Sequence, residues 1–200
     1  MDNQSIKANY ELREMARNQL KGQWGTAILL ILVFTAITYI PSFLPRSAAF
    51  IVNLIITGPL TLGLIACFMN LVRGESFQFE KLFDGFSNFS PALFTYLLTS
   101  LYILLWSILL VIPGFIAAYR YSMAFFILND NPDMSASDSI SASKDMMRGY
   151  KGKLFMLHLS FIGWAILSTL TLGIGFLWLF PYFQTSTAYF YENLKEAQTV

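Results

Sequence analysis

The sequence predicts an all-α fold, a polytopic bundle of membrane helices, and three observations lead to this prediction. Hydrophobic residues make up 56% of the 200 residues and charged residues only 12%, against about 45–50% and 25% in soluble domains. Two long segments, 85–119 and 154–191, contain no Asp, Glu, Lys or Arg. Each apolar run is long enough to cross a hydrocarbon core of about 30 Å.

The lengths of the apolar runs predict six spans. A single helix over 154–191 would be about 57 Å long, nearly twice the hydrocarbon thickness. It must turn, and the glycines of "TLGIGF" suit a tight reversal. The run from 91 to 128 is predicted to turn at Pro113-Gly114 by the same reasoning. We therefore predict three hairpins with spans near 25–44, 48–72, 91–112, 114–129, 154–172 and 174–191.

The distribution of lysine and arginine predicts the orientation. Eleven of the thirteen basic residues fall before, between or after the spans on one side. Arg46 falls on the other side, and Arg120 lies within the fourth span. The six spans predict a multi-pass protein. The positive-inside rule predicts that both its N- and C-termini lie in the cytoplasm.

Short amphipathic segments precede each hairpin on the predicted cytoplasmic side. They end in "LKGQWG", "FDGFSN" and "MRGYKG", and the first glycine of each is Gly22, Gly85 or Gly149. We predict a single integral membrane domain, 1–200. The near-equal spacing of the three glycines indicates possible repeat units within it, 5–72, 75–129 and 135–191. The alternative is that glycine simply ends each amphipathic helix.

These segments are predicted to lie in the lipid headgroup layer, where basic side chains meet anionic lipid. The predicted interface residues are Arg13, Arg17, Lys21, Phe79, Phe83, Phe86, Lys144 and Arg148. Trp24 suits an interfacial position at the start of the first span. Trp106, Trp164 and Trp178 are expected to lie deeper and to pack.

Arg120 is the most unusual residue, because an arginine inside a span is costly. No acidic residue lies in any predicted span. Three hypotheses remain. The guanidinium donates to carbonyls freed at Pro59 and Pro113 and to its neighbours Tyr119 and Tyr121, it binds an anion, or it pairs with an acid on a partner protein. Gly58-Pro59 is expected to break the second span, as a packing kink or as the lining of a cavity.

Few residues suggest chemistry. His158, the single histidine, lies in the fifth predicted span, where a packing role competes with a role as ligand or base. The sequence has no zinc-ligand spacing, phosphate loop or nucleophile elbow. We therefore predict no catalytic residues, no metal, no cofactor and no enzyme activity. No basic cluster suggests a nucleic acid partner.

Several segments resemble a known family. They are "GPLTLG", "NLVRGE", "FDGF", "IPGFIAAYRYSMAFFILNDNP", "SASKDMMRGYKGKLFMLHLSFIGW" and "LTLGIGFLWLFPYFQTSTAYFYENL". Together they are similar to bacterial integral membrane proteins catalogued as domain of unknown function 975. The resemblance implies six spans in a bacterial cytoplasmic membrane and no known activity. A fainter similarity to the membrane part of some glycerophosphodiester phosphodiesterases implies no enzyme activity for this chain.

The leading functional hypothesis is an uncharacterised, non-enzymatic integral membrane protein of the bacterial envelope. It would bind membrane lipids, or another membrane protein, as an accessory or scaffold component. Arg120, Tyr119, Tyr121, Pro59 and His158 are its candidate ligand-binding residues. The alternative is a small-solute or anion transporter or channel in which Arg120 lines the path.

Overall fold

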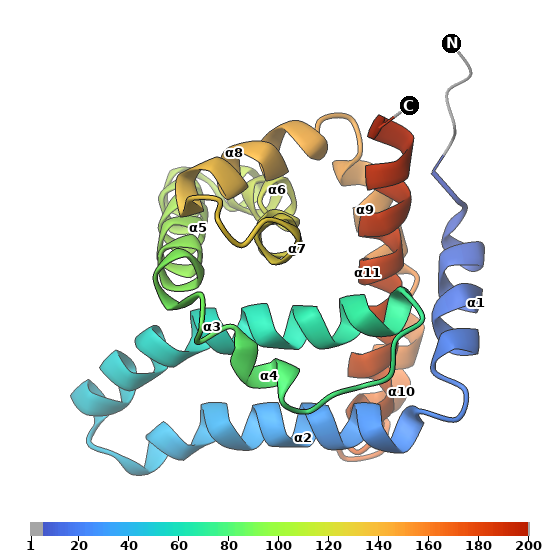
Figure 1. Cartoon of the computed structure of the whole chain (residues 1–200), viewed down its shortest axis with the longest axis horizontal. Helices are drawn as coiled ribbons and strands as arrows, with labels where there is room; N and C mark the ends of the chain where they lie inside the picture. The colour runs from blue at the N-terminus through green and yellow to red at the C-terminus, as the bar shows by residue number, and fades with distance from the viewer. Residues whose placement is uncertain (1–5, 200) are drawn as a thin grey trace. The chain divides into compact units, whose positions relative to one another are not determined.

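The structure, a computed structural model, describes residues 6–199, and these residues form helices and turns with no strand among them. The all-α prediction is confirmed. Residue 5, the first of the first predicted repeat unit, lies outside the described residues. The helices are α1 Asn9–Gln19, α2 Trp24–Tyr39, η1 Ile40–Phe43, α3 Arg46–Val72, α4 Lys81–Asp84, α5 Phe89–Leu109, α6 Val111–Arg120, α7 Ala124–Asp130, α8 Ala136–Met146, α9 Lys151–Leu159, α10 Ile162–Leu170 and α11 Phe176–Thr199 (Figure 1).

Within the described residues, five helical segments are long and apolar enough to cross a membrane. They are Trp24–Phe43, Arg46–Val72, Phe89–Leu109, Val111–Asp130 and Lys151–Leu170. The chain is therefore a multi-pass membrane protein by the length and composition of its helices. All but the first two residues of the predicted sixth span, 174–191, lie in α11, a 24-residue helix that is not among the five candidates. The polar run from Gln184 to Thr187 makes α11 less apolar than the other long helices, so a sixth span stays a prediction.

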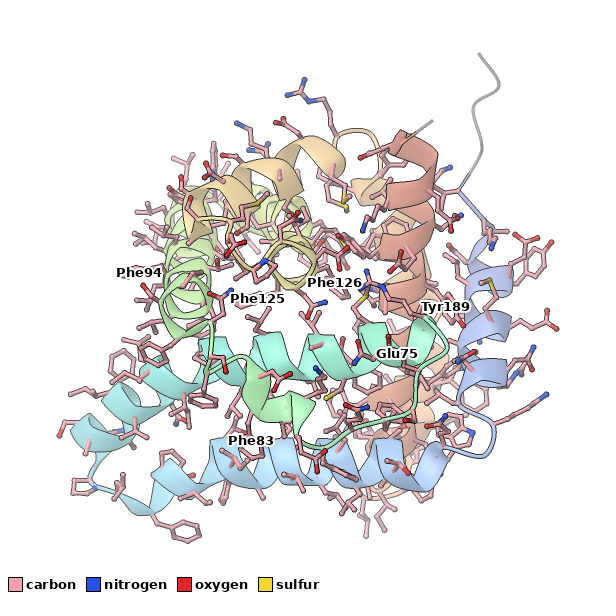
Figure 2. The ribbon with its side chains drawn as sticks, viewed as in Figure 1. Glu75, Phe83, Phe94, Phe125, Phe126 and Tyr189 are labelled. Atoms are coloured by element: carbon pink, nitrogen blue, oxygen red, sulfur yellow. The ribbon has the colours of Figure 1, made fainter. Side chains whose placement is uncertain are left out.

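The outer surfaces of these helices carry large apolar side chains, as expected for helices that contact lipid. Ile108, Leu170 and Phe94 are among the exposed side chains. Phe83 and Phe94 project from α4 and α5 in Figure 2. A soluble monomer rarely exposes apolar surface on this scale.

The chain divides into two compact units. Among the described residues, unit 1 contains 6–33, 68–77 and 152–199, and unit 2 contains 34–67 and 78–151. In unit 1, α1 lies along α11, and α10 packs against α11. In unit 2, α5 packs against α6, α7 and α8. The core between these helices of unit 2 includes Ala117, Tyr121, Ala124 and Ile140.

The two predicted turns have different outcomes. "TLGIGF" turns as predicted, with positive φ angles of 54° at Leu172 and 88° at Gly173. The turn predicted at Pro113-Gly114 is wrong by about three residues, since α5 and α6 meet at Leu110, which is extended. Pro113 lies in the first turn of α6, where its missing N–H removes no helical hydrogen bond.

Glycine lets the helices on either side of each turn approach closely. A Cβ on Gly114 would overlap the hydroxyl of Ser107, and one on Gly175 would lie 2.7 Å from Ser168 Oγ. Both pairs have the same seven-residue separation. The same contact thus closes α5 on α6 and α10 on α11.

The predicted break at Gly58-Pro59 is wrong, because α3 continues through Pro59. The segment serves close packing within unit 2. A Cβ on Gly58 would lie 2.7 Å from the carbonyl oxygen of Ala92, and one on Gly63 would fall on the carbonyl oxygen of Leu82. Gly85 meets the carbonyl oxygen of Pro59 in the same way. Backbone of α4 at Leu82 and of α5 at Ala92 therefore lies directly against α3.

The fourth predicted span is interrupted directly after Arg120, where α6 ends and three residues pass before α7 begins. The hydroxyl of Ser143, on α8, bridges this interruption. It donates to the carbonyl oxygen of Arg120 at 3.0 Å and accepts from the N–H of Met123 at 3.1 Å. Ser143 is fully buried, so one side chain satisfies two backbone groups that the helix leaves open.

The amphipathic segments differ in what covers them. Leu12 and Ala16 of α1 are fully buried in unit 1, where α1 packs on α11. Ser139, Ile140 and Ser143 of α8 are buried in unit 2, where α8 packs on α5 and α7. The apolar stripes of α1 and α8 therefore contact protein, and the position of these helices in the headgroup layer stays a prediction. The segment around α4 keeps Phe83 and Phe86 exposed.

We predict that Gly63→Ala destabilises the protein by about 1–3 kcal/mol, because the added methyl group meets backbone that has no room to move. Gly25→Ala is the matched control. It lies in α2 with open space around its Cβ position, and alanine there gains up to about 1 kcal/mol of helix propensity. Unfolding in detergent measures both variants. Equal stability of the two would contradict the packing described for α3.

Ser143→Ala is predicted to cost about 1–3 kcal/mol for each of the two backbone groups that it leaves without a partner. Ser141→Ala, on the exposed side of α8, is expected to change stability by less than about 0.5 kcal/mol. Hydrogen exchange at the amide of Met123 adds a local readout, and it is expected to accelerate only in Ser143→Ala. Unchanged protection in that variant would refute the bridging role.

Candidate functional site

The structure does not gather the predicted ligand-binding residues into one site. Arg120 is half-buried, and its guanidinium forms no hydrogen bond or ion pair with residues 6–199. Tyr119 packs on Phe115, with ring centroids 5.1 Å apart. Tyr121 is buried beside Tyr102, at 5.7 Å. Within residues 6–199, the guanidinium of Arg120 therefore donates to no carbonyl near Pro59 or Pro113.

Pro59 and His158 also have packing environments. Pro59 is buried, and its carbonyl oxygen meets Gly85. His158 belongs to unit 1, where its ring lies 4.4 Å from that of Phe183 and its Nε2 lies 3.3 Å from Thr187 Oγ1. Thr187 already donates its proton to the carbonyl oxygen of Phe183 at 2.9 Å, so His158 Nε2 is the donor in this pair. The residues described here include no cluster of three His, Cys, Asp or Glu side chains that could hold a metal.

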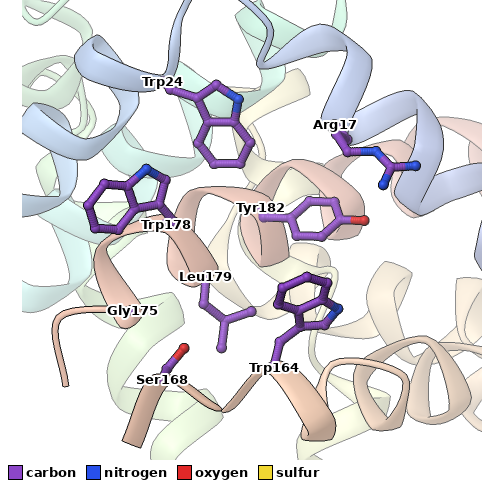
Figure 3. Close-up of a pocket in the computed structure, with 8 residues that line it drawn as sticks. All are labelled: Arg17, Trp24, Trp164, Ser168, Gly175, Trp178, Leu179 and Tyr182. Carbon is purple, nitrogen blue, oxygen red and sulfur yellow. The ribbon is translucent and has the colours of Figure 1, made fainter. Parts of the chain in front are cut away.

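The site that the structure does assemble is a cavity of about 230 Å³ in unit 1. We call it the aromatic groove. Its lining residues are Arg17, Trp24, Trp164, Ser168, Gly175, Trp178, Leu179 and Tyr182. Figure 3 shows the three indole rings around Tyr182 and Leu179, with the guanidinium of Arg17 near Tyr182. Three of the four tryptophans of the chain therefore line one cavity.

Each wall of the groove has a local cause. Trp178 and Tyr182 are four residues apart on α11, and Trp164 and Ser168 are four apart on α10, so each pair lies on one helix face. Gly175 lets α11 begin in close contact with Ser168. Trp24 begins α2 after the turn at Gly22, and its ring packs edge-on against Tyr182 at 6.5 Å.

Arg13 holds α1 against this part of unit 1. Its guanidinium carbon lies 5.2 Å from the ring centroid of Phe161, within cation–π range. Arg13 Nη1 donates to the carbonyl oxygen of Ser160 at 3.3 Å, and Nε donates to the hydroxyl of Tyr182 at 3.4 Å. Ser160 lies between α9 and α10, so its carbonyl has no helical partner. One turn further along α1, Arg17 reaches the groove.

The expectation that Trp106, Trp164 and Trp178 pack inside the protein is wrong. The side chains of Trp164 and Trp178 are 51% and 49% exposed, on the open side of the groove, and that of Trp106 on α5 is 40% exposed. The i, i+4 spacing of Trp178 and Tyr182 was visible in the sequence. Their meeting with Trp24 and Arg17 was not, because about 150 residues separate these segments along the chain.

A second cavity, of about 220 Å³, lies elsewhere in unit 1 and has charged walls. Arg73 Nε donates to Glu192 Oε1 at 2.7 Å. The backbone N–H of Lys7 donates to Asn193 Oδ1 at 2.7 Å, and Tyr189, labelled in Figure 2, donates to Gln19 Oε1 at 3.2 Å. These pairs join α11 to the α1 segment and to the end of α3, which gives the cavity a structural role.

Comparisons with known proteins identify the family. No curated protein and no solved structure matches the chain. One protein family, described as "Protein of unknown function (DUF975)", matches residues 1–113 and 107–198. The matched segments cover nearly the whole sequence, including every residue of the aromatic groove. The chain is therefore a member of the domain of unknown function 975 family of proteins.

Proposed function

We propose that this protein is a non-enzymatic integral membrane protein that binds anionic membrane lipids and serves as an accessory or scaffold component of the bacterial cytoplasmic membrane. The observation that supports this most is a set of exposed, unpaired cations next to membrane-spanning helices. Arg17, Lys21 and Lys144 are exposed and form no ion pair with the described residues. Each such cation near an anionic leaflet contributes about 1 kcal/mol of attraction.

The proposed orientation follows from these charges. Lys21 directly precedes the first candidate span, and Lys144 lies on α8, between the fourth and fifth candidate spans. Segments in these places face the same side of the membrane if four successive spans cross it. The cytoplasmic leaflet carries the negative surface potential, so we place the cations and the N-terminus in the cytoplasm. The C-terminus lies there too if α11 forms the predicted sixth span.

The mode of packing supports a scaffold role. The apolar stripes of α1 and α8 are used within their own units, so these helices do not need lipid to cover them. Their charged sides stay open to lipid phosphates or to an acidic membrane protein. Lipid binding on such a preformed surface orders few side chains, which lowers its entropic cost.

The proposal predicts that the protein selects anionic lipid. In nanodiscs with equal phosphatidylglycerol and phosphatidylcholine, native mass spectrometry is expected to find phosphatidylglycerol enriched on the wild type. The triple variant Arg17→Gln, Lys21→Gln, Lys144→Gln is expected to lose this enrichment, since three attractive charges are removed. Raised salt should weaken the enrichment in the wild type.

The matched control removes three exposed acids, as Glu14→Gln, Glu75→Gln, Glu80→Gln, and is expected to retain or increase the enrichment. Arg120→Gln is a second comparison and should bind lipid as the wild type does. Equal retention of both lipids by the wild type would overturn the proposal. If Arg120→Gln lost the lipid enrichment and the triple variant kept it, the lipid site would be at Arg120 instead.

A further inference from the structure

We propose that the aromatic groove is the binding site for one anionic glycerophospholipid, with its phosphate at Arg17 and the upper part of an acyl chain between Trp164, Trp178 and Leu179. This inference rests on the proposed function and names the place and the pose of one lipid. Three features of the groove lead to it: its length and apolar walls, its single charge, and its unpaired donors.

The walls suit a hydrocarbon chain. The groove extends from Gly175, directly before α11, to Tyr182 on that helix, about 10 Å at the rise of an α-helix. Indole faces and the Leu179 side chain form most of this length, and the two half-exposed tryptophans leave it open along one side. An acyl chain can therefore enter sideways from the bilayer without any movement of the backbone.

The charge suits a phosphate. Arg17 supplies the only charged side chain among the lining residues, and its guanidinium has no partner among the residues that the structure describes. Arg13, one turn away, is already engaged with Ser160 and Tyr182. The fork of N–H donors on Arg17 matches phosphate oxygens. A cation at this position disfavours the quaternary ammonium groups that aromatic cages otherwise attract.

The donors suit ester oxygens. The indole N–H groups of Trp24, Trp164 and Trp178 make no hydrogen bond within the described residues. Such groups usually find a partner when they are buried, and a lipid bound in the groove would cover them. The ester carbonyls and phosphate of a glycerophospholipid lie just above its acyl chains and present several acceptors. One lipid can therefore satisfy the charge, the donors and the apolar walls together.

Tryptophan fluorescence gives a direct test. Trp106, on α5, is the one tryptophan that does not line the groove, so Trp106→Phe leaves only groove fluorescence. This variant is placed in phosphatidylcholine vesicles with a small fraction of phosphatidylglycerol whose acyl chains are brominated. The same fraction of brominated phosphatidylcholine is the reference, because bromine quenches only indoles that it touches.

Brominated phosphatidylglycerol is expected to quench at a concentration roughly fivefold lower than brominated phosphatidylcholine, which corresponds to about 1 kcal/mol for one arginine. Arg17→Gln should remove this difference, and Arg46→Gln, the same charge change at an exposed arginine of unit 2, should keep it. Equal quenching by the two lipids would overturn the inference, as would a preference that survives in Arg17→Gln. If nanodisc enrichment persists in either case, the proposed function stands and only the groove assignment fails.

Discussion

The peptide groups of a membrane-spanning chain must find their hydrogen-bond partners within the protein, because the hydrocarbon interior supplies none. This constraint accounts for the helical architecture, and it also explains the polar residues at the places where helices stop. Ser143 bonds the carbonyl of Arg120 and the N–H of Met123 where α6 gives way to α7. Arg13 bonds the carbonyl of Ser160 where α9 gives way to α10. In each unit, a side chain from a predicted amphipathic segment therefore forms a hydrogen bond with a backbone group at the point where a candidate span is interrupted.

This arrangement connects the fold to the candidate site. Arg13 binds at the interruption between α9 and α10, and it thereby holds α1 alongside α11 with Arg17 one turn further on, at the aromatic groove. The groove itself depends on Gly175, since a larger residue would push α11 away from Ser168. A structural arginine and a structural glycine thus position a second arginine and three tryptophans. Arg17 is the arginine that this arrangement leaves without an ion pair among the described residues, and a lipid phosphate would bind there.

Much of the architecture could be predicted from the sequence, because span length and charge segregation are local properties. Five candidate spans coincide with predicted ones, and the turn at Gly173 has the positive φ that glycine permits. The errors at Pro113 and Pro59 have one cause. Proline was treated as a break, yet it fits the first turn of a helix, and at Pro59 the helix continues through it. The capping role expected of Arg120 belongs to Arg13, since helix spacing alone cannot say which arginine meets an open carbonyl.

The groove could not be predicted, since it joins residues from α1, α2, α10 and α11 that no sequence pattern connects. The measurement that tests lipid binding at this place most directly is photo-crosslinking with a phosphatidylglycerol that carries a diazirine near the top of one acyl chain, followed by mapping of the labelled residues. We predict labels concentrated at Trp164, Trp178 and Leu179. Labels spread evenly over exposed apolar residues of other helices, such as Ile108 and Phe94, would contradict the account.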